Sequence, residues 1–160
     1  MTGLGRVVRL GGAANGAAQA EITELRRLGI TTPVSLADAS GLSPADGIAP
    51  ETLIRTLAVA ASTPRLRGAI TGLPVAGFAG TLSAGQSDFG GIGGAALGVV
   101  RAKTGNLATV ATLAGLAYDR SGRLLLFAIM APQVPSADQL KSAANAIDDA
   151  AAGLAECGCS

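Results

Sequence analysis

The tripeptide Lys103-Thr104-Gly105 brings together three residue types that could act jointly on a ligand. Lysine supplies a positive charge, threonine supplies a hydroxyl, and glycine lets a ligand approach the backbone closely. This lysine is one of only two in the chain, and it lies among apolar residues that read as a strand. The context indicates a functional group rather than plain solvated surface, and the alternative is an edge strand whose lysine reaches out into water.

On an ideal strand Lys103 and Gly105 point to one side of the sheet and Thr104 to the other. We therefore expect the three residues to act together only where the glycine permits a twist or a bulge.

The residues that are absent narrow the chemistry further. The chain of 160 residues contains no histidine, which excludes a Ser-His-Asp or Cys-His catalytic set and a histidine metal site within it. Its formal net charge of +1 and its few aromatic residues argue against nucleic-acid binding. Any acid-base chemistry must use lysine, tyrosine or carboxylates, and we expect no metal and no cofactor.

The two cysteines, Cys157 and Cys159, form a C-x-C pair near the end of the chain. Two thiols cannot complete a four-ligand zinc site. A bond between them would close a very small, strained ring, so we expect a partner elsewhere or free thiols.

Three other groups favour ordinary structural roles. The cluster Gly91-x-Gly93-x-x-Ala96 lacks the strand before it and the helix after it that a nucleotide fingerprint requires. Asp148 and Asp149 are neighbours that would face apart on a helix, which favours a solvated face over a metal pair. Ser40 and Ser43 have no base within sequence reach, so we expect their hydroxyls to cap turns.

The elements that must position these residues can be read from spacing. Helices are predicted over about 16–28, with a face of Ala18, Ile22, Leu25 and Leu28, and from Pro50 to Pro64, with a face of Ile54, Leu57, Ala58 and Ala61. A short strand is predicted over 30–37, a loop with short helical or extended pieces over 65–82, and a mobile glycine-rich loop over 83–98. Residues 107–117 and 124–131 predict an antiparallel hairpin.

The final segment gives the clearest helix signal. Ser136 and Gln139 form a capping box, and apolar residues recur at helical spacing through Leu140, Ala144, Ile147, Ala151 and Leu154. We expect a helix over about 137–155 laid on the sheet. No apolar run approaches the roughly 18 residues of a membrane span, and residues 1–16 lack the apolar core of a signal peptide.

Three blocks of the chain together resemble the class C low-molecular-mass penicillin-binding proteins, the serine D-alanyl-D-alanine carboxypeptidase and endopeptidase family. The stretch from Gly98 to Ala131 is similar to that family's K-T-G strand and following hairpin. The loop DASGLSPADGIAP resembles its D-G-S-G-L-S-R-x-N loop, and LPVAGFAGTL resembles its L-P-x-A-G-x-x-G-T-L segment. The blocks occur in the family's order and spread over most of the chain.

The chain also departs from the family pattern. Pro44 and Asp46 replace the loop arginine and asparagine, and K-T-G-T is K-T-G-N here. No S-x-x-K occurs in these 160 residues, and Ser87-Asp88 is followed by Phe89 instead of asparagine. The nucleophile box and the S-x-N box, which lie upstream in the family, are therefore missing from the sequence.

The resemblance implies an α+β fold, an antiparallel sheet covered by helices, with residues 1–160 as one unit from the C-terminal part of a serine peptidase domain. It implies cleavage of the terminal D-Ala of peptidoglycan stem peptides, or of their cross-links, through an acyl-serine intermediate that β-lactams mimic. Lys103 would polarise the site, Thr104 and Gly105 would bind substrate, and the Asn106 N–H would serve the oxyanion. An extracytoplasmic location follows by the same resemblance, and the alternative function is a non-catalytic module that binds cell-wall peptide or serves assembly.

Overall fold

The computed structural model describes residues 14–83 and 94–157 of the chain. It contains, in chain order, α2 (Ala14–Arg27), β1 (Val34–Ser35), β2 (Gly47–Ile48), α3 (Pro50–Ser62), the 3-10 helix η2 (Pro64–Leu66), α4 (Arg67–Thr71), the 3-10 helix η3 (Gly80–Leu82), β3 (Val100–Leu107), β4 (Val110–Tyr118), β5 (Leu124–Ala131) and α5 (Ala137–Glu156). The predicted α+β class is confirmed. None of the helices described is long and apolar enough to cross a membrane.

The chain divides into two compact units, Met1–Thr56 and Leu57–Ser160. The assignment of residues 1–160 to one part of a larger peptidase domain stays a prediction. The K-T-G residues all belong to the second unit.

The first unit contains α2 and the hairpin of β1 and β2. The predicted apolar face of α2 is confirmed by Ala18, which is almost completely buried, and Gly29 ends the helix with a φ of +79°. The strand expected over 30–37 is shorter, because only Val34 and Ser35 pair, with Ile48 and Gly47. Within this unit the hydroxyls of Thr32 and the buried Thr52 lie 2.6 Å apart, so the start of α3 is tied to the chain before β1.

Helix α3 begins at Pro50 as predicted, but its buried face differs from the predicted one. Thr52 and Ala60 are its most buried side chains, whereas Ala58, expected inside, is exposed. The apolar count alone misplaced the face because residues 57–61 of this helix are all apolar, so that several faces are almost equally apolar there.

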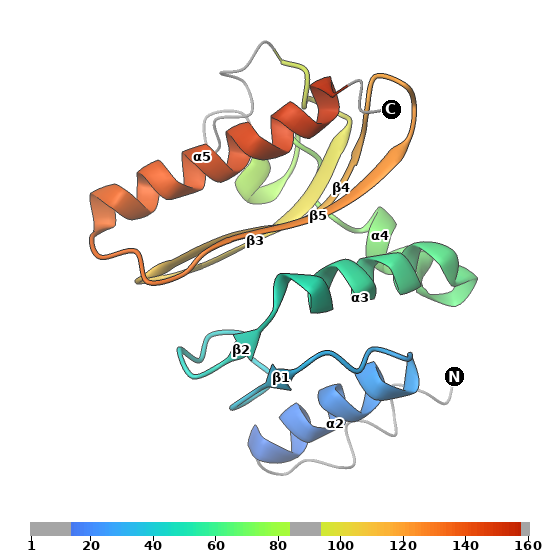
Figure 1. Cartoon of the computed structure of the whole chain (residues 1–160), viewed down its shortest axis with the longest axis vertical. Coiled ribbons are helices and arrows are strands. Elements are labelled where there is room, and N and C mark those ends of the chain that lie inside the picture. The colour runs from blue at the N-terminus through green and yellow to red at the C-terminus, as the bar shows by residue number, and fades with distance from the viewer. Residues whose placement is uncertain (1–13, 84–93, 158–160) are drawn as a thin grey trace. The chain divides into compact units, whose positions relative to one another are not determined.

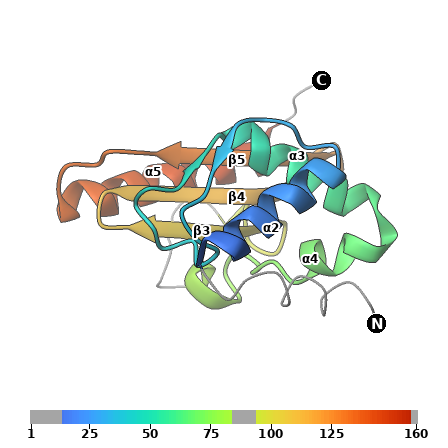
Figure 2. The same ribbon diagram turned by 90° about the horizontal axis from the view of Figure 1, so that it is seen from below.

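The second unit is built on a three-stranded antiparallel sheet in the order β3-β4-β5 (Figures 1 and 2). The predicted hairpin of 107–117 with 124–131 is confirmed as β4 and β5, except that β4 begins at Val110 and Leu107 is the last residue of β3. Ala108 and Thr109 form the intervening two-residue turn, and neither has the positive φ of a type I′ turn. Without an Asn-Gly or Asp-Gly signal, this turn could not be recognised in the sequence.

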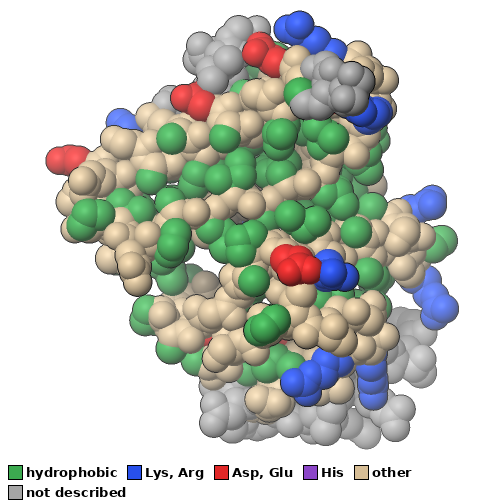
Figure 3. Space-filling view, in the orientation of Figure 1, with side chains coloured by type: hydrophobic (Ala, Val, Ile, Leu, Met, Phe, Trp, Pro, Cys, Tyr) green, Lys and Arg blue, Asp and Glu red, His purple; other side chains and the backbone are tan. Residues whose placement is uncertain are grey.

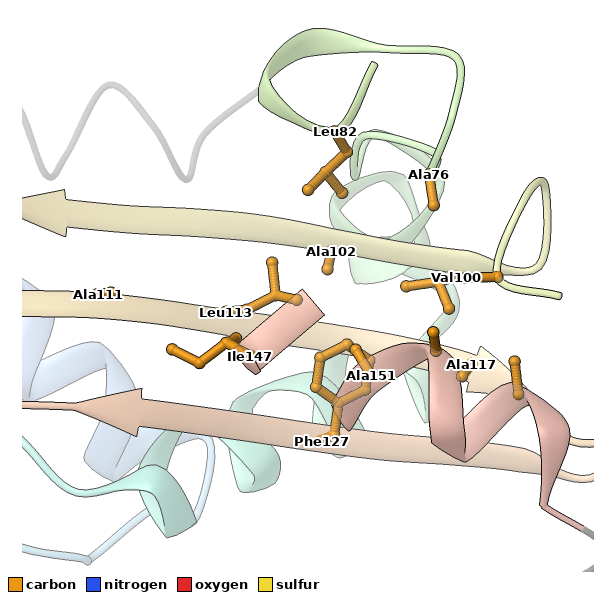
Figure 4. Close-up of a cluster of buried hydrophobic side chains, with 13 residues drawn as sticks. Ala76, Leu82, Val100, Ala102, Ala111, Leu113, Ala117, Phe127, Ile147 and Ala151 are labelled. Carbon is orange, nitrogen blue, oxygen red and sulfur yellow. The ribbon is translucent and has the colours of Figure 1, made fainter. Parts of the chain in front are cut away.

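Helix α5 covers one face of the sheet and contributes Ile147, Ala151, Ala152 and Ala155 to the core (Figure 4). Leu113 of β4 and Phe127 of β5 point toward Ile147 and Ala151 of α5, and Val100 and Ala102 of β3 line the same layer (Figure 4). The many alanines of the chain let the helix lie close to the sheet, which compensates for the few aromatic side chains. The predicted helix over 137–155 and its Ser136 cap are confirmed.

One expectation near the C-terminus is wrong, and one alternative for the cysteines is excluded. Asp148 is buried, 8% exposed, because it follows Ile147 on the side of α5 that faces the sheet, whereas Asp149 is exposed as expected. Cys157 is disulfide-bonded, which excludes the free thiol, one of the two alternatives expected for it. Cys159 lies outside the described residues.

Charged side chains are sparse in both units of the chain. On the described residues of the face drawn in Figure 3, basic and acidic side chains are scattered among uncharged ones, without a block of either sign. The predicted mobile loop over 83–98 and the glycines Gly91 and Gly93 lie largely or wholly outside the described residues, so those expectations stay predictions.

Candidate functional site

Strand β3 is an edge strand, and its outer edge is only partly covered. The Ala76 N–H donates to the Val100 carbonyl across 2.9 Å, and the Ala102 N–H donates to the Pro74 carbonyl across 3.0 Å. Alternate residues of a strand direct their backbone groups to the same edge, so Thr104 and Asn106 face outward like Val100 and Ala102. Beyond Ala102 no backbone segment among the described residues pairs with them, and the outer edge is open there.

The K-T-G residues follow the regular pleat of β3. Eight consecutive pairs join β3 to β4, from Val100 with Ala117 to Leu107 with Val110, so the strand contains no bulge. Thr104 and Asn106 therefore share the face of Ala102, on which α5 packs, while Lys103 and Gly105 lie on the opposite face. A bulge does not bring the ammonium and the hydroxyl together.

Lys103 instead reaches round to the strand's edge. Its Nζ donates to the carbonyl oxygen of Thr104 across 2.7 Å, and the side chain is exposed. The charge of Lys103 thus lies at the open edge of β3, next to the residue that carries the hydroxyl. The alternative interpretation, an edge strand whose lysine reaches out into water, also agrees with the exposed side chain, so the role of Lys103 stays a prediction.

A second hydroxyl, from Thr81, lies beside that of Thr104. The two Oγ1 atoms are 2.8 Å apart although 23 residues separate them in the chain. Thr81 lies in η3, within the segment LPVAGFAGTL, whose earlier part covers the edge of β3. The sequence analysis did not propose Thr81 as a site residue. The available signal was its place in LPVAGFAGTL, one of the three blocks that resemble the family.

The glycine of the tripeptide makes room for a side chain of the neighbouring strand. Thr112 of β4 donates its hydroxyl to the Gly105 carbonyl across 2.9 Å. A Cβ at position 105 would lie 2.6 Å from that hydroxyl oxygen, closer than real contacts allow. Gly105 thus leaves space for the Thr112 side chain on the face of the sheet opposite α5.

A hollow of about 200 Å³ lies beside Thr104 on the α5 side of the sheet. Its lining combines hydroxyl, amide and carboxyl groups with apolar atoms, and comprises Thr81, Thr104, Asn106, Ala111, Thr112, Leu113, Ala144, Ile147 and Asp148. The four predicted site residues are consecutive along β3, and two of them, Thr104 and Asn106, line the same hollow.

The loop that follows β1 is organised by its own polar side chains. Hydrogen bonds from the hydroxyl and the backbone N–H of Ser40 lower the pKa of Asp38. Ser40 accepts from Leu42 N, and Ser43 accepts from Ala45 N, so the turn-capping role expected for both serines is confirmed. Asp46, which departs from the family pattern, closes the loop by accepting from Ala37 N across 2.8 Å.

Comparison with known proteins agrees with the resemblance seen in the three blocks. Residues 3–154 match the D-Ala-D-Ala carboxypeptidase 3 (S13) family. Carboxypeptidase DacB of Mycolicibacterium smegmatis is 42% identical over 147 residues, which is 90% of this chain and 31% of that protein. Carboxypeptidase Rv3627c of Mycobacterium tuberculosis is 37% identical over 148 residues, or 91% of this chain and 31% of that protein. The chain therefore spans less than a third of the length of these relatives.

The solved structures agree on the fold. The crystal structure of penicillin binding protein 4 from Haemophilus influenzae in complex with a β-lactam superposes with a TM-score of 0.73 at 24% identity, covering 86% of this chain and 33% of that one. The expected penicillin-binding-protein fold is thereby confirmed. Because the family's description matches residues 3–154, nearly the whole chain, the chain belongs to the D-Ala-D-Ala carboxypeptidase 3 (S13) family.

Proposed function

We propose that this chain forms the substrate-binding strand of a serine-type D-Ala-D-Ala carboxypeptidase or endopeptidase whose nucleophile lies outside these 160 residues. The observation that carries the proposal is the open edge of β3, where the Thr104 hydroxyl, the Lys103 ammonium and the outward-facing backbone of Asn106 are adjacent. Family membership supports the same class of reaction.

Thr104, Lys103 and Asn106 suit the two negative charges of the reaction, which are the substrate's terminal carboxylate and the oxyanion that forms during attack. A substrate ending in D-Ala carries a terminal carboxylate, to which the Thr104 hydroxyl donates a hydrogen bond and Lys103 offers positive charge. When a serine oxygen attacks the carbonyl carbon of the bond to be cut, negative charge develops on the carbonyl oxygen. The Asn106 N–H, directed to the open edge, is one donor for that oxygen.

The remaining steps need groups outside this chain. The serine forms an ester with the acyl group as the C–N bond breaks and the D-Ala amine leaves with a proton, and water then hydrolyses the ester. Peptidoglycan stem peptides are the substrates and β-lactams the acylating analogues under this proposal. The protein would act outside the cytoplasm, where such peptides occur.

The test uses a complete protein that contains this chain. The segment of carboxypeptidase DacB matched by this chain is replaced with residues 1–160, and acylation by a fluorescent penicillin is followed together with D-Ala release from a stem-peptide analogue. We expect the chimera to be acylated, and the chain on its own to remain unlabelled because no serine in it has a lysine three residues on.

Substitutions in the chimera then locate the site. Thr104→Val removes a charge-assisted hydrogen bond worth about 1.5 to 3 kcal/mol, so acylation efficiency should fall roughly 10- to 150-fold. Lys103→Ala should cost at least as much, whereas Lys141→Ala, on the exposed side of α5, should change nothing. An acylated chimera insensitive to Lys103→Ala and Thr104→Val contradicts the proposal. Binding of stem peptide without acylation indicates the non-catalytic alternative.

A further inference from the structure

We infer that Thr81 is a positioning residue, which holds the Thr104 hydroxyl with its proton directed toward the substrate carboxylate. The inference rests on the proposed function and extends it to a residue outside the K-T-G tripeptide. Its basis is the 2.8 Å contact between the two hydroxyl oxygens at the rim of the hollow beside β3.

Thr81 is held in place from both sides along the chain. The preceding segment is fixed to β3 by the hydrogen bonds of Pro74 and Ala76 with Ala102 and Val100. The following residue, Leu82, is completely buried in the core. Because its neighbours are fixed to the sheet itself, Thr81 keeps its place relative to Thr104 better than a residue on a free loop would.

The backbone of this segment is also tied to itself. The Gly77 N–H donates to the Leu82 carbonyl across 2.7 Å, and Gly80 adopts a φ of +59° that starts the 3-10 turn. The short helix therefore presents Thr81 from a closed loop. The side chain itself remains exposed, so a ligand that reaches Thr104 also reaches this pair.

The donor assignment follows from counting protons. Each hydroxyl has one proton, and the contact between the two oxygens uses one of them. If Thr104 donated to Thr81, it would have no proton left for a carboxylate. With Thr81 as the donor, Thr104 keeps its proton for the ligand, and the hydrogen bond that it accepts polarises its own O–H.

Asn106 does not replace Thr81 in this role. It shares the face of Thr104 and lines the same hollow, but the contact made with the Thr104 hydroxyl comes from Thr81. The direct ligand of the carboxylate in this scheme is Thr104. Thr81 acts through it.

The experiment compares two substrates in the DacB chimera: a thioester stem-peptide analogue that ends in a carboxylate and the matched analogue that ends in a carboxamide. Loss of one neutral hydrogen bond predicts that Thr81→Val lowers kcat/KM for the carboxylate substrate about 3- to 10-fold. The same variant should leave kcat/KM for the carboxamide within about twofold, since no carboxylate depends on the Thr104 proton.

Three further variants complete the test. Thr81→Ser keeps a hydroxyl and should retain the activity of the unsubstituted chimera on both substrates. Thr81→Val added to Thr104→Val should cost nothing more, because the group it positions is already gone. Thr71→Val is the matched control: it is the same substitution on α4, where the hydroxyl contacts only carbonyls of its own helix, and it should have no effect.

The outcomes separate the two proposals. Equal losses on both substrates, or no loss on the carboxylate, contradict the role of Thr81 while leaving the proposed function standing. A folded, unsubstituted chimera that is not acylated contradicts the proposed function, and the role of Thr81 with it.

Discussion

The hydroxyl of Thr112 occupies the space that a side chain at Gly105 would need. It donates to the Gly105 carbonyl across 2.9 Å and would lie 2.6 Å from a Cβ placed there. The two residues face each other in the β3–β4 register. The glycine of the tripeptide thus has a packing reason that is independent of any ligand.

The first prediction is that Gly105→Ala destabilises the chain through this one contact. Thr112 must rotate and give up its hydrogen bond, which lowers the free energy of unfolding by about 1 to 2 kcal/mol in urea titrations. In a Thr112→Ala background the space is free, and alanine restricts the unfolded chain more than glycine does. There Gly105→Ala should be neutral or stabilising by up to about 1 kcal/mol. Additive effects of the two substitutions would contradict this explanation.

The second prediction concerns Gly115 of β4, where no rotation of a side chain can make room for a Cβ. A Cβ there would overlap the Arg101 carbonyl oxygen and lie 2.6 Å from the Ala102 Cα, and both are backbone atoms of β3. We expect Gly115→Ala to cost more than about 3 kcal/mol or to prevent folding, as judged by thermal unfolding and soluble yield.

The matched control for Gly115 is Gly153 in α5, where a Cβ meets nothing within 4 Å. Gly153→Ala should stabilise the chain by about 0.5 to 1 kcal/mol, because alanine is the better helix former. Destabilisation at Gly153, or tolerance of alanine at Gly115, would show that the close approach of β3 and β4 is not as described.

Periodic elements were predictable from the sequence because their signals are local. Helix α5 has a capping box and a regular apolar spacing, and both the cap at Ser136 and the buried side of the helix agree with that pattern. The predicted extent of the first strand, 30–37, was wrong, because Pro33 and the turn formers after it leave only Val34 and Ser35 to pair. Its partner, Gly47–Ile48, lies across a loop that gives no strand signal.

Within the site, the sequence indicated β3 but not what β3 contacts. Lys103 and Thr104 were recognisable from the tripeptide and its neighbourhood, whereas Thr81 reaches Thr104 only through the tertiary arrangement of the segment around Pro74 and Leu82. Asp148 was misjudged for a related reason. The apolar pattern of α5 indicated the covered face, but it did not show that this face extends past Ile147 to include a carboxylate.

The third prediction concerns the start of α5. Ser136 accepts from the Gln139 N–H across 3.3 Å, and its hydroxyl donates to the Gln139 side-chain oxygen across 3.1 Å. Ser136→Ala should lower the free energy of unfolding by about 1 kcal/mol, while Ser136→Asp should restore it because aspartate caps as well and its charge suits a helix N-terminus. Ser142→Ala, on the exposed side of the same helix, is the control and should cost nothing. A loss at Ser142 as large as at Ser136 would contradict a capping role.

The last prediction concerns acid stability and the turn between β4 and β5. Asp119, whose side chain is fully buried, accepts from the backbone N–H of Arg123 and of Ser121, and also from the Arg123 guanidinium. These bonds, the one from the Arg123 N–H foremost, hold the pKa of Asp119 below its ordinary value of 3.8. A carboxyl with a lowered folded-state pKa contributes stability that is fully present above the ordinary value and is lost as the pH falls through the folded-state pKa.

Asp119→Asn should therefore lower Tm near neutral pH and flatten the fall of Tm below about pH 4, compared with the unsubstituted chain. The comparison is made as a difference between the two proteins at each pH, because Asp38 has a lowered pKa as well and titrates in both. Arg123→Met removes the guanidinium but keeps the backbone N–H, so it should leave most of the acid dependence in place. The explanation is contradicted if the Tm of Asp119→Asn falls at low pH as steeply as that of the unsubstituted chain. It is also contradicted if Arg123→Met abolishes that fall, because the backbone N–H groups of the turn would then not be what stabilises the ionised carboxyl.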